Sequence, residues 1–217
     1  MRLTRKVVAM LILALSAPAA AQSGLHTAAR DNDTAGISAL LERGVDIETR
    51  DSHGRTALMV ATHANAVDAA RVLMAAGADV NARDDIADTP YLYAGAEGRL
   101  EILRLTVASD ADLASVNRYG GTALIPAAHH GHVETVRFLL TTAVDIDHVN
   151  NLGWTALLEA VILGDGSDPY VRIVELLLRA DADYRIPDRD GVTALEHAQR
   201  SGQTRIAALL RSAASRE

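Results

Sequence analysis

Short apolar segments alternate with polar turns along most of the chain. Small and aliphatic side chains predominate in residues 123–130. After Gly131, a second segment keeps its apolar residues at helical spacing, at Val133, Val136, Leu139 and Leu140. Spacing of three and four residues puts such side chains on one face of a helix. The pattern predicts pairs of short helices separated by polar, Gly-containing turns, and therefore an all-α chain.

The pattern recurs with a fixed period. A Thr precedes an apolar segment at intervals of 33 residues, at Thr56, Thr89, Thr122 and Thr155, and again 38 residues later at Thr193. Thr is a favoured helix N-cap, because its hydroxyl accepts a hydrogen bond from a free backbone N–H. We therefore expect each of these Thr residues to begin a helix. A sustained period of this length indicates a stacked repeat architecture.

Each unit has the same internal order. A polar turn such as 51–54 comes first, then Thr-Ala-Leu, and the unit ends on a segment such as 77–81, Gly-Ala-Asp-Val-Asn. Together with 131–136, Gly-His-Val-Glu-Thr-Val, these segments resemble the ankyrin-repeat family over about residues 23–212. The resemblance implies an ankyrin-repeat solenoid of about six helix-turn-helix repeats with β-turn fingers. It divides residues 22–213 into repeats at about 22–50, 51–83, 84–116, 117–149, 150–187 and 188–213, followed by a polar tail at 214–217.

Some positions depart from the family pattern. The third repeat has Ala87 in place of the turn Gly, so we expect its finger to be less regular than its neighbours. Pro126 and Glu159 stand where the first helix of a repeat usually has Leu. The fifth repeat is five residues longer than the others, and the extra length falls within 163–170, between its two expected helices. That insertion is either part of a binding face or a loop extension of small entropic cost.

The first 21 residues have the features of a secretory signal peptide. Arg2, Arg5 and Lys6 precede a nine-residue apolar run at 7–15, and an Ala-x-Ala pattern ends at Ala21. The run is too short to cross a bilayer as a helix. We therefore expect cleavage between Ala21 and Gln22 and a periplasmic or secreted protein. A retained N-terminal anchor is the alternative.

Charge narrows the class of partner. Cleavage would leave 21 − 3 = 18 basic residues against 28 acidic ones, and Lys6 is the sole Lys. A net charge of −10 argues against nucleic acid and against anionic membranes, since both attract basic surfaces. We expect a protein partner that carries a basic patch. We also expect the chain to be a monomer, and it has no disulfides because it has no Cys.

The sequence offers little for catalysis. His129, His130 and His132 could suggest a metal site, but neighbouring helical side chains point about 100° apart and cannot easily share an ion. The acidic groups at 84–88 and 165–168 are best explained as solvated turns, and no nucleophile elbow, phosphate loop or zinc-binding motif occurs. We expect no enzyme activity, no metal and no cofactor.

The resemblance implies a concave groove lined by finger tips and first helices. The candidate binding residues are Arg55, His63, Arg118, Tyr119, His129, His130, Leu152, Trp154, Ile162, Leu163, Asp165, Asp168 and Tyr170. Within this set, Tyr119, Leu152, Trp154, Ile162 and Leu163 are the expected hot spot, with 165–170 as a flap, since Trp and Tyr are favoured interface anchors. Alternatively, Trp154 packs sideways on the next finger and stiffens the stack.

These observations predict a non-catalytic protein-binding module that acts as an adaptor, an inhibitor or a protective partner of another exported protein. A secreted effector that acts on a host protein is an alternative. An enzyme or metal-binding protein that uses the His-rich groove is a second, less supported one. The location of the protein, in the periplasm or in the medium and host cells, would separate the binding module from the effector. Its metal content would test the enzyme or metal-binding alternative.

Overall fold

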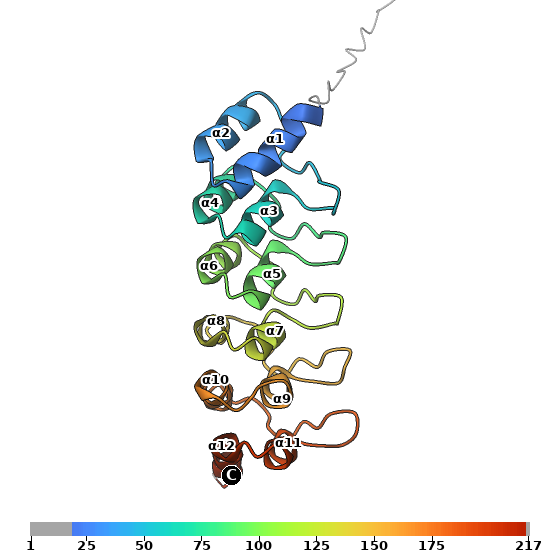
Figure 1. Cartoon of the computed structure of the whole chain (residues 1–217), viewed down its shortest axis with the longest axis vertical. Coiled ribbons are helices and arrows are strands. Elements are labelled where there is room, and N and C mark those ends of the chain that lie inside the picture. The colour runs from blue at the N-terminus through green and yellow to red at the C-terminus, as the bar shows by residue number, and fades with distance from the viewer. Residues whose placement is uncertain (1–18, 216–217) are drawn as a thin grey trace, which may run out of the picture.

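The helices of the protein stack in two parallel columns. The structure is a computed structural model that describes residues 19–215. Within this range the secondary structure is entirely helical, in six antiparallel pairs, with the first helix of each pair in one column and the second helix in the other (Figure 1). The helices are α1 (Ala19–Arg30), α2 (Thr34–Glu42), α3 (Ala57–Ala64), α4 (Val67–Ala75), α5 (Pro90–Ala96), α6 (Leu100–Ala108), α7 (Leu124–His129), α8 (Val133–Leu139), α9 (Ala156–Ile162), α10 (Asp168–Arg179), α11 (Ala194–Arg200) and α12 (Thr204–Ala214). The all-α, six-repeat prediction is confirmed.

A finger connects each pair to the next and projects from one side of the stack (Figure 1). An Asp or Asn opens each finger and holds it by accepting two backbone hydrogen bonds, from the residues two and four positions later. In the second repeat, Oδ1 of Asp51 lies 2.8 Å from the N of His53 and 3.0 Å from the N of Arg55. The same pair of bonds recurs at Asp84, Asn117, Asn150 and Asp188. Short polar side chains therefore fold the fingers locally.

The third finger is as regular as its neighbours, so the expectation based on Ala87 is wrong. Ala87 has φ of 66°, close to the 69° of Gly54. Its N–H donates to the carbonyl of Asp84 at 3.0 Å, as that of Gly54 donates to Asp51 at 3.1 Å. A left-handed non-Gly residue costs about 1 kcal/mol, and the two hydrogen bonds of the Asp84 side chain offset that cost.

Thr residues begin four of the five helices for which the sequence predicts a Thr cap. The hydroxyls of Thr56, Thr89, Thr155 and Thr193 each accept a hydrogen bond from the backbone N–H three residues later. Thr122 is the exception: α7 begins two residues after it, and its hydroxyl is buried without a hydrogen-bond partner. The chain at 122–126 makes its first turn bond through the backbone instead, from the N–H of Ile125 to the carbonyl of Thr122.

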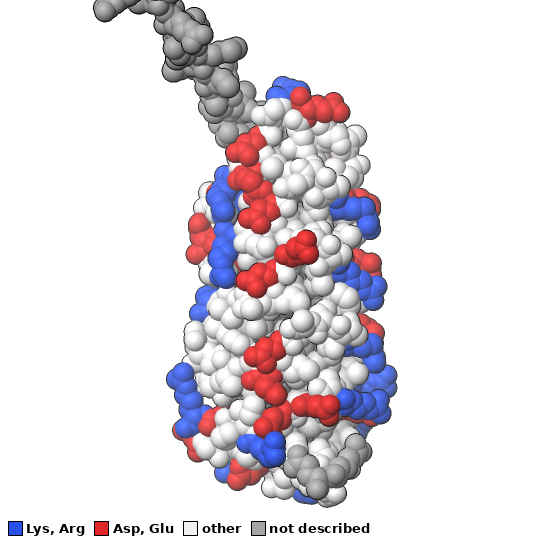
Figure 2. Space-filling model, turned by 180° about the vertical axis from the view of Figure 1, so that it is seen from behind, with Lys and Arg blue, Asp and Glu red and all other residues white. Residues whose placement is uncertain are grey.

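Small side chains allow the helices to pack closely. The core is one continuous cluster that runs through all six repeats and consists mainly of Ala, Leu, Val and Ile. Tyr91 is the largest fully buried side chain. Each repeat buries its apolar faces against its neighbours, so stability is a sum of local interfaces along the stack. Acidic side chains form a central stripe on the back of the stack, with Arg mostly along the edges (Figure 2).

The insertion of the fifth repeat is anchored rather than free. Residues Asp168 to Tyr170 form the first turn of α10, which is longer than α4, α6 and α8, and so only 163–167 is loop. The Tyr170 hydroxyl donates to the carbonyl of His129 at 2.9 Å, and Asp168 pairs with Arg205. These contacts tie the insertion to the repeats before and after it, so the expected flap over 165–170 is replaced by a braced segment.

The predicted signal peptide falls mostly outside the described residues. Helix α1 begins at Ala19, so the predicted junction between Ala21 and Gln22 lies in its first turn. Among residues 19–215, no helix has the length and apolar character needed to cross a membrane.

Candidate functional site

Exposed apolar side chains line up on three consecutive finger tips. Ile86, Tyr119 and Leu152 are 48%, 53% and 46% exposed, and they occupy the same finger position because they are 33 residues apart. The N–H of Asn151 donates to the carbonyl of Tyr119 at 2.9 Å and joins the fourth and fifth fingers, and Nη1 of Arg83 donates to the carbonyl of Val116 at 3.0 Å and joins the third repeat to the fourth. A row of exposed apolar side chains held on linked fingers is the kind of surface that marks a binding site.

This row forms one wall of a groove of about 430 Å³, which we call the central groove. The floor consists of α5, α7 and the start of α9. Tyr93, Pro126 and Glu159 contribute to it from the same helical position, nine residues after the Asp or Asn that opens each finger. The groove also contains Asp88, Glu97, Arg118, His129 and His130. The central groove thus combines apolar walls with a small number of charged groups, as ligand-binding clefts do.

A buried carboxyl group lies at the floor of the central groove. Glu159 is only 6% exposed. Its Oε1 accepts a 2.9 Å hydrogen bond from Nδ2 of Asn150, and its Oε2 lies 3.6 Å from Nδ1 of His129. Burial raises the pKa of Glu159 to about 7, although the Asn150 hydrogen bond and nearby His130 act in the opposite direction. Near neutral pH this group therefore exists in both protonation states.

The other charged groups of the central groove are partly compensated. Arg118 stacks over the ring of Tyr119 at 4.7 Å and lies 3.8 Å from the carboxylate of Asp88. Burial and the neighbouring charge of Asp84 raise the pKa of Asp88. At the other end, burial and His130 lower the pKa of His129, which favours its neutral form.

The structure brings five of the thirteen candidate residues into the central groove: Arg118, Tyr119, His129, His130 and Leu152. Trp154, Ile162 and Tyr170 instead lie half-buried against the core. Leu163, Asp165 and Asp168 are exposed on the insertion, outside the groove lining. The five residues expected as a hot spot are therefore divided, and the half-burial of Trp154 against the core favours the stiffening role.

Two candidates lie beside the central groove. His63 stacks on Tyr93 with ring centroids 3.7 Å apart, so it supports one side of the floor. Arg55 pairs with Asp51 at 2.7 Å in a finger nearer the N-terminus. Sequence reasoning missed Ile86 and Tyr93 and treated Glu159 only as a departure from the family. The 33-residue spacing from Tyr119 and Leu152 would have found Ile86.

The rings of the His cluster lie tilted and edge-on to one another. The ring centroids of His129 and His130 are 4.6 Å apart, those of His130 and His132 are 5.8 Å apart, and Nδ1 of His130 lies 2.7 Å from the carbonyl oxygen of Ala96. In the part of the chain that the structure describes, no three His, Asp or Glu side chains are grouped to hold a metal ion.

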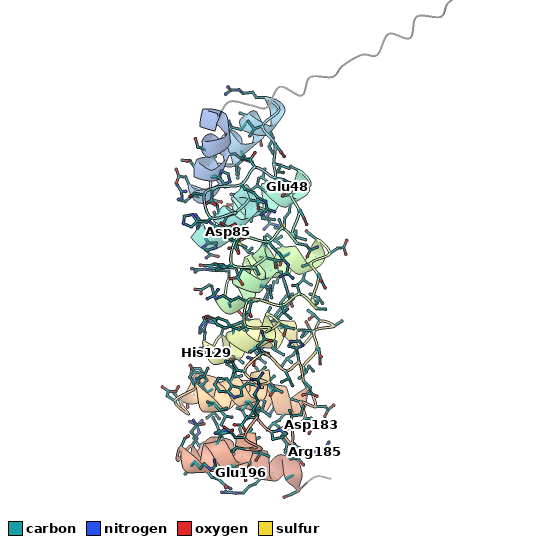
Figure 3. All side chains as sticks on the ribbon, turned by 90° about the vertical axis from the view of Figure 1, so that its right-hand side faces the viewer. Glu48, Asp85, His129, Asp183, Arg185 and Glu196 are labelled. Carbon is teal, nitrogen blue, oxygen red and sulfur yellow. The ribbon has the colours of Figure 1, made fainter. Side chains whose placement is uncertain are left out.

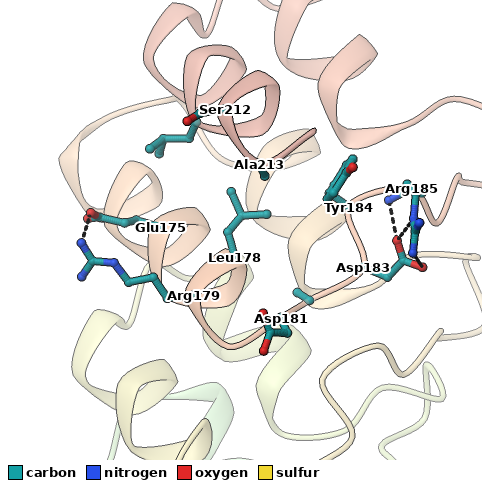
Figure 4. A pocket seen from close by; sticks show the side chains of 11 residues that line it. Glu175, Leu178, Arg179, Asp181, Asp183, Tyr184, Arg185, Ser212 and Ala213 are labelled. Atoms are coloured by element: carbon teal, nitrogen blue, oxygen red, sulfur yellow. Dashed lines mark hydrogen bonds and ion pairs between the residues drawn. The ribbon is translucent and has the colours of Figure 1, made fainter. Parts of the chain in front are cut away.

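A second pocket lies near the C-terminal end, between α10 and α12 (Figure 4). Four of its five charged side chains form local pairs: Arg179 lies 2.7 Å from Glu175, and Arg185 lies 2.8 Å from Asp183. Asp183 and Arg185 lie on the opposite side of the stack from His129 (Figure 3). Its larger apolar side chains, Leu178, Tyr184 and Leu209, are half-buried, whereas the central groove has the exposed Ile86, Tyr119 and Leu152.

The family model for ankyrin repeats in three copies matches residues 5–84 and 91–188. The chain belongs to the ankyrin-repeat family. Ankyrin repeats are in general protein–protein interaction modules and are typically non-catalytic. No curated protein matches the sequence.

Solved structures agree with this assignment. An ankyrin-repeat domain (ABAYE2397) from Acinetobacter baumannii AYE is 57% identical with a TM-score of 0.85, and the match covers 88% of this chain and 97% of that one. The ankyrin-repeat protein EF0377 is 42% identical with a TM-score of 0.84, over 88% and 97% of the two chains. The ankyrin-repeat domain of Bcl-3, a member of the IkappaB protein family, is 27% identical with a TM-score of 0.79, over 88% and 85%.

Proposed function

We propose that the protein is an exported, monomeric, non-catalytic binding module that captures a segment of another exported protein along the central groove, as an adaptor, inhibitor or protective partner. The observation that carries this proposal is the row of Ile86, Tyr119 and Leu152 on three linked finger tips. Exposing three large apolar side chains in one row has no benefit for the solubility of the free protein. A partner that covers them gains the hydrophobic free energy of burial.

The rigidity of the site supports recognition without large rearrangement. The Asp and Asn side chains lock each finger, and the braced insertion holds the His129 end of the groove. A preformed surface loses little conformational entropy when it binds, which favours affinity. The role in export rests on the N-terminal pattern at residues 2–21. Fractionation of cells that express the full chain tests it: mature protein in the periplasm or medium supports export, and retention in the cytoplasm contradicts it.

The binding proposal is tested by affinity capture with the purified protein as bait. The test variant is Tyr119→Ala/Leu152→Ala, which removes two side chains of the row. The matched control is Val149→Ala/Leu163→Ala, because these side chains are 46% and 42% exposed and lie outside the central groove. We expect one exported protein to bind the unaltered bait and the control but not the test variant. Equal capture by all three baits, or capture by none, would contradict the proposal.

A further inference from the structure

We propose that the central groove receives a basic side chain, Arg or Lys, from the bound segment, with the carboxylate of Glu159 as its acceptor. This inference rests on the proposed function, because it specifies the partner chemistry of the same site. Four features support it: the burial of Glu159, its incomplete hydrogen bonding, the apolar walls above it and the charge balance of the groove.

Glu159 lacks the hydrogen bonds that a buried carboxylate normally has. A carboxylate can accept about four hydrogen bonds. Here Oε1 receives one from Asn150, while Oε2 has the ring of His129 at 3.6 Å, beyond hydrogen-bond distance. Burying a charge without sufficient donors costs several kcal/mol. An incoming guanidinium or ammonium group would supply the missing donors and a compensating charge.

The walls of the central groove suit the remainder of such a side chain. Arg and Lys carry a hydrocarbon stem that packs on apolar surface while the charged head reaches a polar partner. Tyr119 and Leu152 lie on the wall, and Pro126 lies on the floor beside Glu159. The stem can therefore pass between apolar side chains to reach the carboxylate.

The charge balance of the groove favours a cation over an anion. Its lining contains three carboxyl groups, those of Asp88, Glu97 and Glu159, and one Arg. That residue, Arg118, already lies against Asp88 and the ring of Tyr119. The whole chain carries a net charge of −7, which would attract a basic segment from a distance and raise its association rate.

Binding should depend on pH because a cation stabilises the ionised form of Glu159. The groups that face this carboxyl group are His129 and His130 of α7 and the amide of Asn150. Helices α10 and α11 also pack on α9. The titratable residues of α10 are Asp168, Tyr170, Arg172, Glu175 and Arg179, of which Asp168 pairs with Arg205 and Glu175 with Arg179. Those of α11 are Glu196, His197 and Arg200. His197 lies 2.7 Å from Asp188, and Glu196 caps its own helix, so both are engaged within the sixth repeat.

The test uses a random dodecapeptide display library as the probe. Peptides are selected against the unaltered protein, and those whose binding is lost with Tyr119→Ala/Leu152→Ala are retained. In each retained peptide the basic residue is then replaced by a neutral analogue, citrulline for Arg or norleucine for Lys. Calorimetry measures both peptides against the unaltered protein, Glu159→Gln, and the control Glu101→Gln, which removes an exposed carboxylate on α6.

We expect the retained peptides to share a basic residue at one position. Whether that residue is Arg or Lys shows which head group binds. Neutralising that residue should weaken binding by at least about tenfold to the unaltered protein and to Glu101→Gln, but by less than about twofold to Glu159→Gln. The affinity of the retained peptides for the unaltered protein should rise from pH 6 to pH 8, and this measurement needs no variant. Their affinity for Glu159→Gln should not change over the same range.

The two proposals fail in different ways. Two results would overturn the role of Glu159 and leave the binding function standing. One is a set of groove-dependent peptides that share no basic residue. The other is that neutralising the basic residue weakens binding to Glu159→Gln as much as it weakens binding to the unaltered protein. A library that yields no peptide dependent on Tyr119 and Leu152 would overturn both.

Discussion

Nδ2 of Asn150 donates a 2.9 Å hydrogen bond to Oε1 of Glu159, nine residues later in the chain. The carbonyl oxygen of the same amide accepts hydrogen bonds from the backbone N–H groups of Leu152 and Trp154. One side chain therefore closes the fifth finger and also orients the buried carboxyl group. The finger tip that contributes Leu152 and the floor that contributes Glu159 are mechanically linked through this amide.

The sixth repeat uses the same relationship. Oδ1 of Asp188 accepts from the N–H groups of Asp190 and Val192, and its Oδ2 lies 2.7 Å from Nε2 of His197, again nine residues later. The residue nine positions after the Asp or Asn that opens each finger thus determines the polarity of the floor in its repeat. A polar residue there is tolerated because the finger side chain provides a hydrogen-bond partner.

Replacement of Glu159 by Gln should make the protein more stable above neutral pH. Burial raises the pKa of Glu159 from 4.5 to about 7, so the folded state binds a proton more tightly than the unfolded state between these values. Stability of the unaltered protein therefore falls as pH rises through this window. The loss is on the order of 2 kcal/mol by pH 8, which is less than the full shift would give, because Glu159 lines an open groove and is partly screened.

The free energy of unfolding of both proteins, measured in urea from pH 4.5 to pH 8, checks this prediction. The difference between Glu159→Gln and the unaltered protein should be near zero at pH 4.5 and should favour the variant at pH 8. A difference that does not change with pH would mean that Glu159 titrates normally in the folded protein.

Trp154→Ala should lower stability without affecting partner capture. Trp154 is half-buried and packs against the core, outside the central groove. Removing a partly buried aromatic side chain costs about 2 kcal/mol, somewhat less than at a fully buried position. Urea unfolding followed by circular dichroism, together with affinity capture, separates the two effects. Loss of capture by a folded Trp154→Ala variant would restore this residue to the binding site.

The helix pairs, the fingers and the period could be predicted from sequence because each depends on residues close together in the chain. The Thr caps and the Asp or Asn at each finger act within four residues, so their spacing reveals them. The groove lining depends on which repeats lie next to one another and on which side chains turn outward. A periodic alignment yields the finger-tip row, but the contact between Tyr170 and His129 joins residues 41 positions apart. The half-burial of Trp154 likewise depends on packing between repeats.

Tyr91→Phe should stabilise the protein. The Tyr91 side chain is fully buried, and its hydroxyl is without a hydrogen-bond partner. A buried polar group in that state costs about 1 kcal/mol or more, and Phe keeps the ring while it removes the hydroxyl. We expect a gain of about 1 kcal/mol in the free energy of unfolding, measured in urea. An equal loss would show that the hydroxyl is satisfied in solution.

The two Thr residues at 155 and 122 provide a matched pair. Both are buried, with 2% and 1% exposure, and both precede a first helix. The hydroxyl of Thr155 caps α9 by accepting from the N–H of Leu158 at 3.2 Å, whereas that of Thr122 has no partner. Val has the shape of Thr without the hydroxyl, so Thr155→Val should cost about 1 kcal/mol through loss of the cap. Thr122→Val should be neutral or stabilising, because it removes only an unpaired polar atom. Urea unfolding of the two variants under the same conditions checks the contrast, and equal destabilisation would mean that Thr122 also caps its helix in solution.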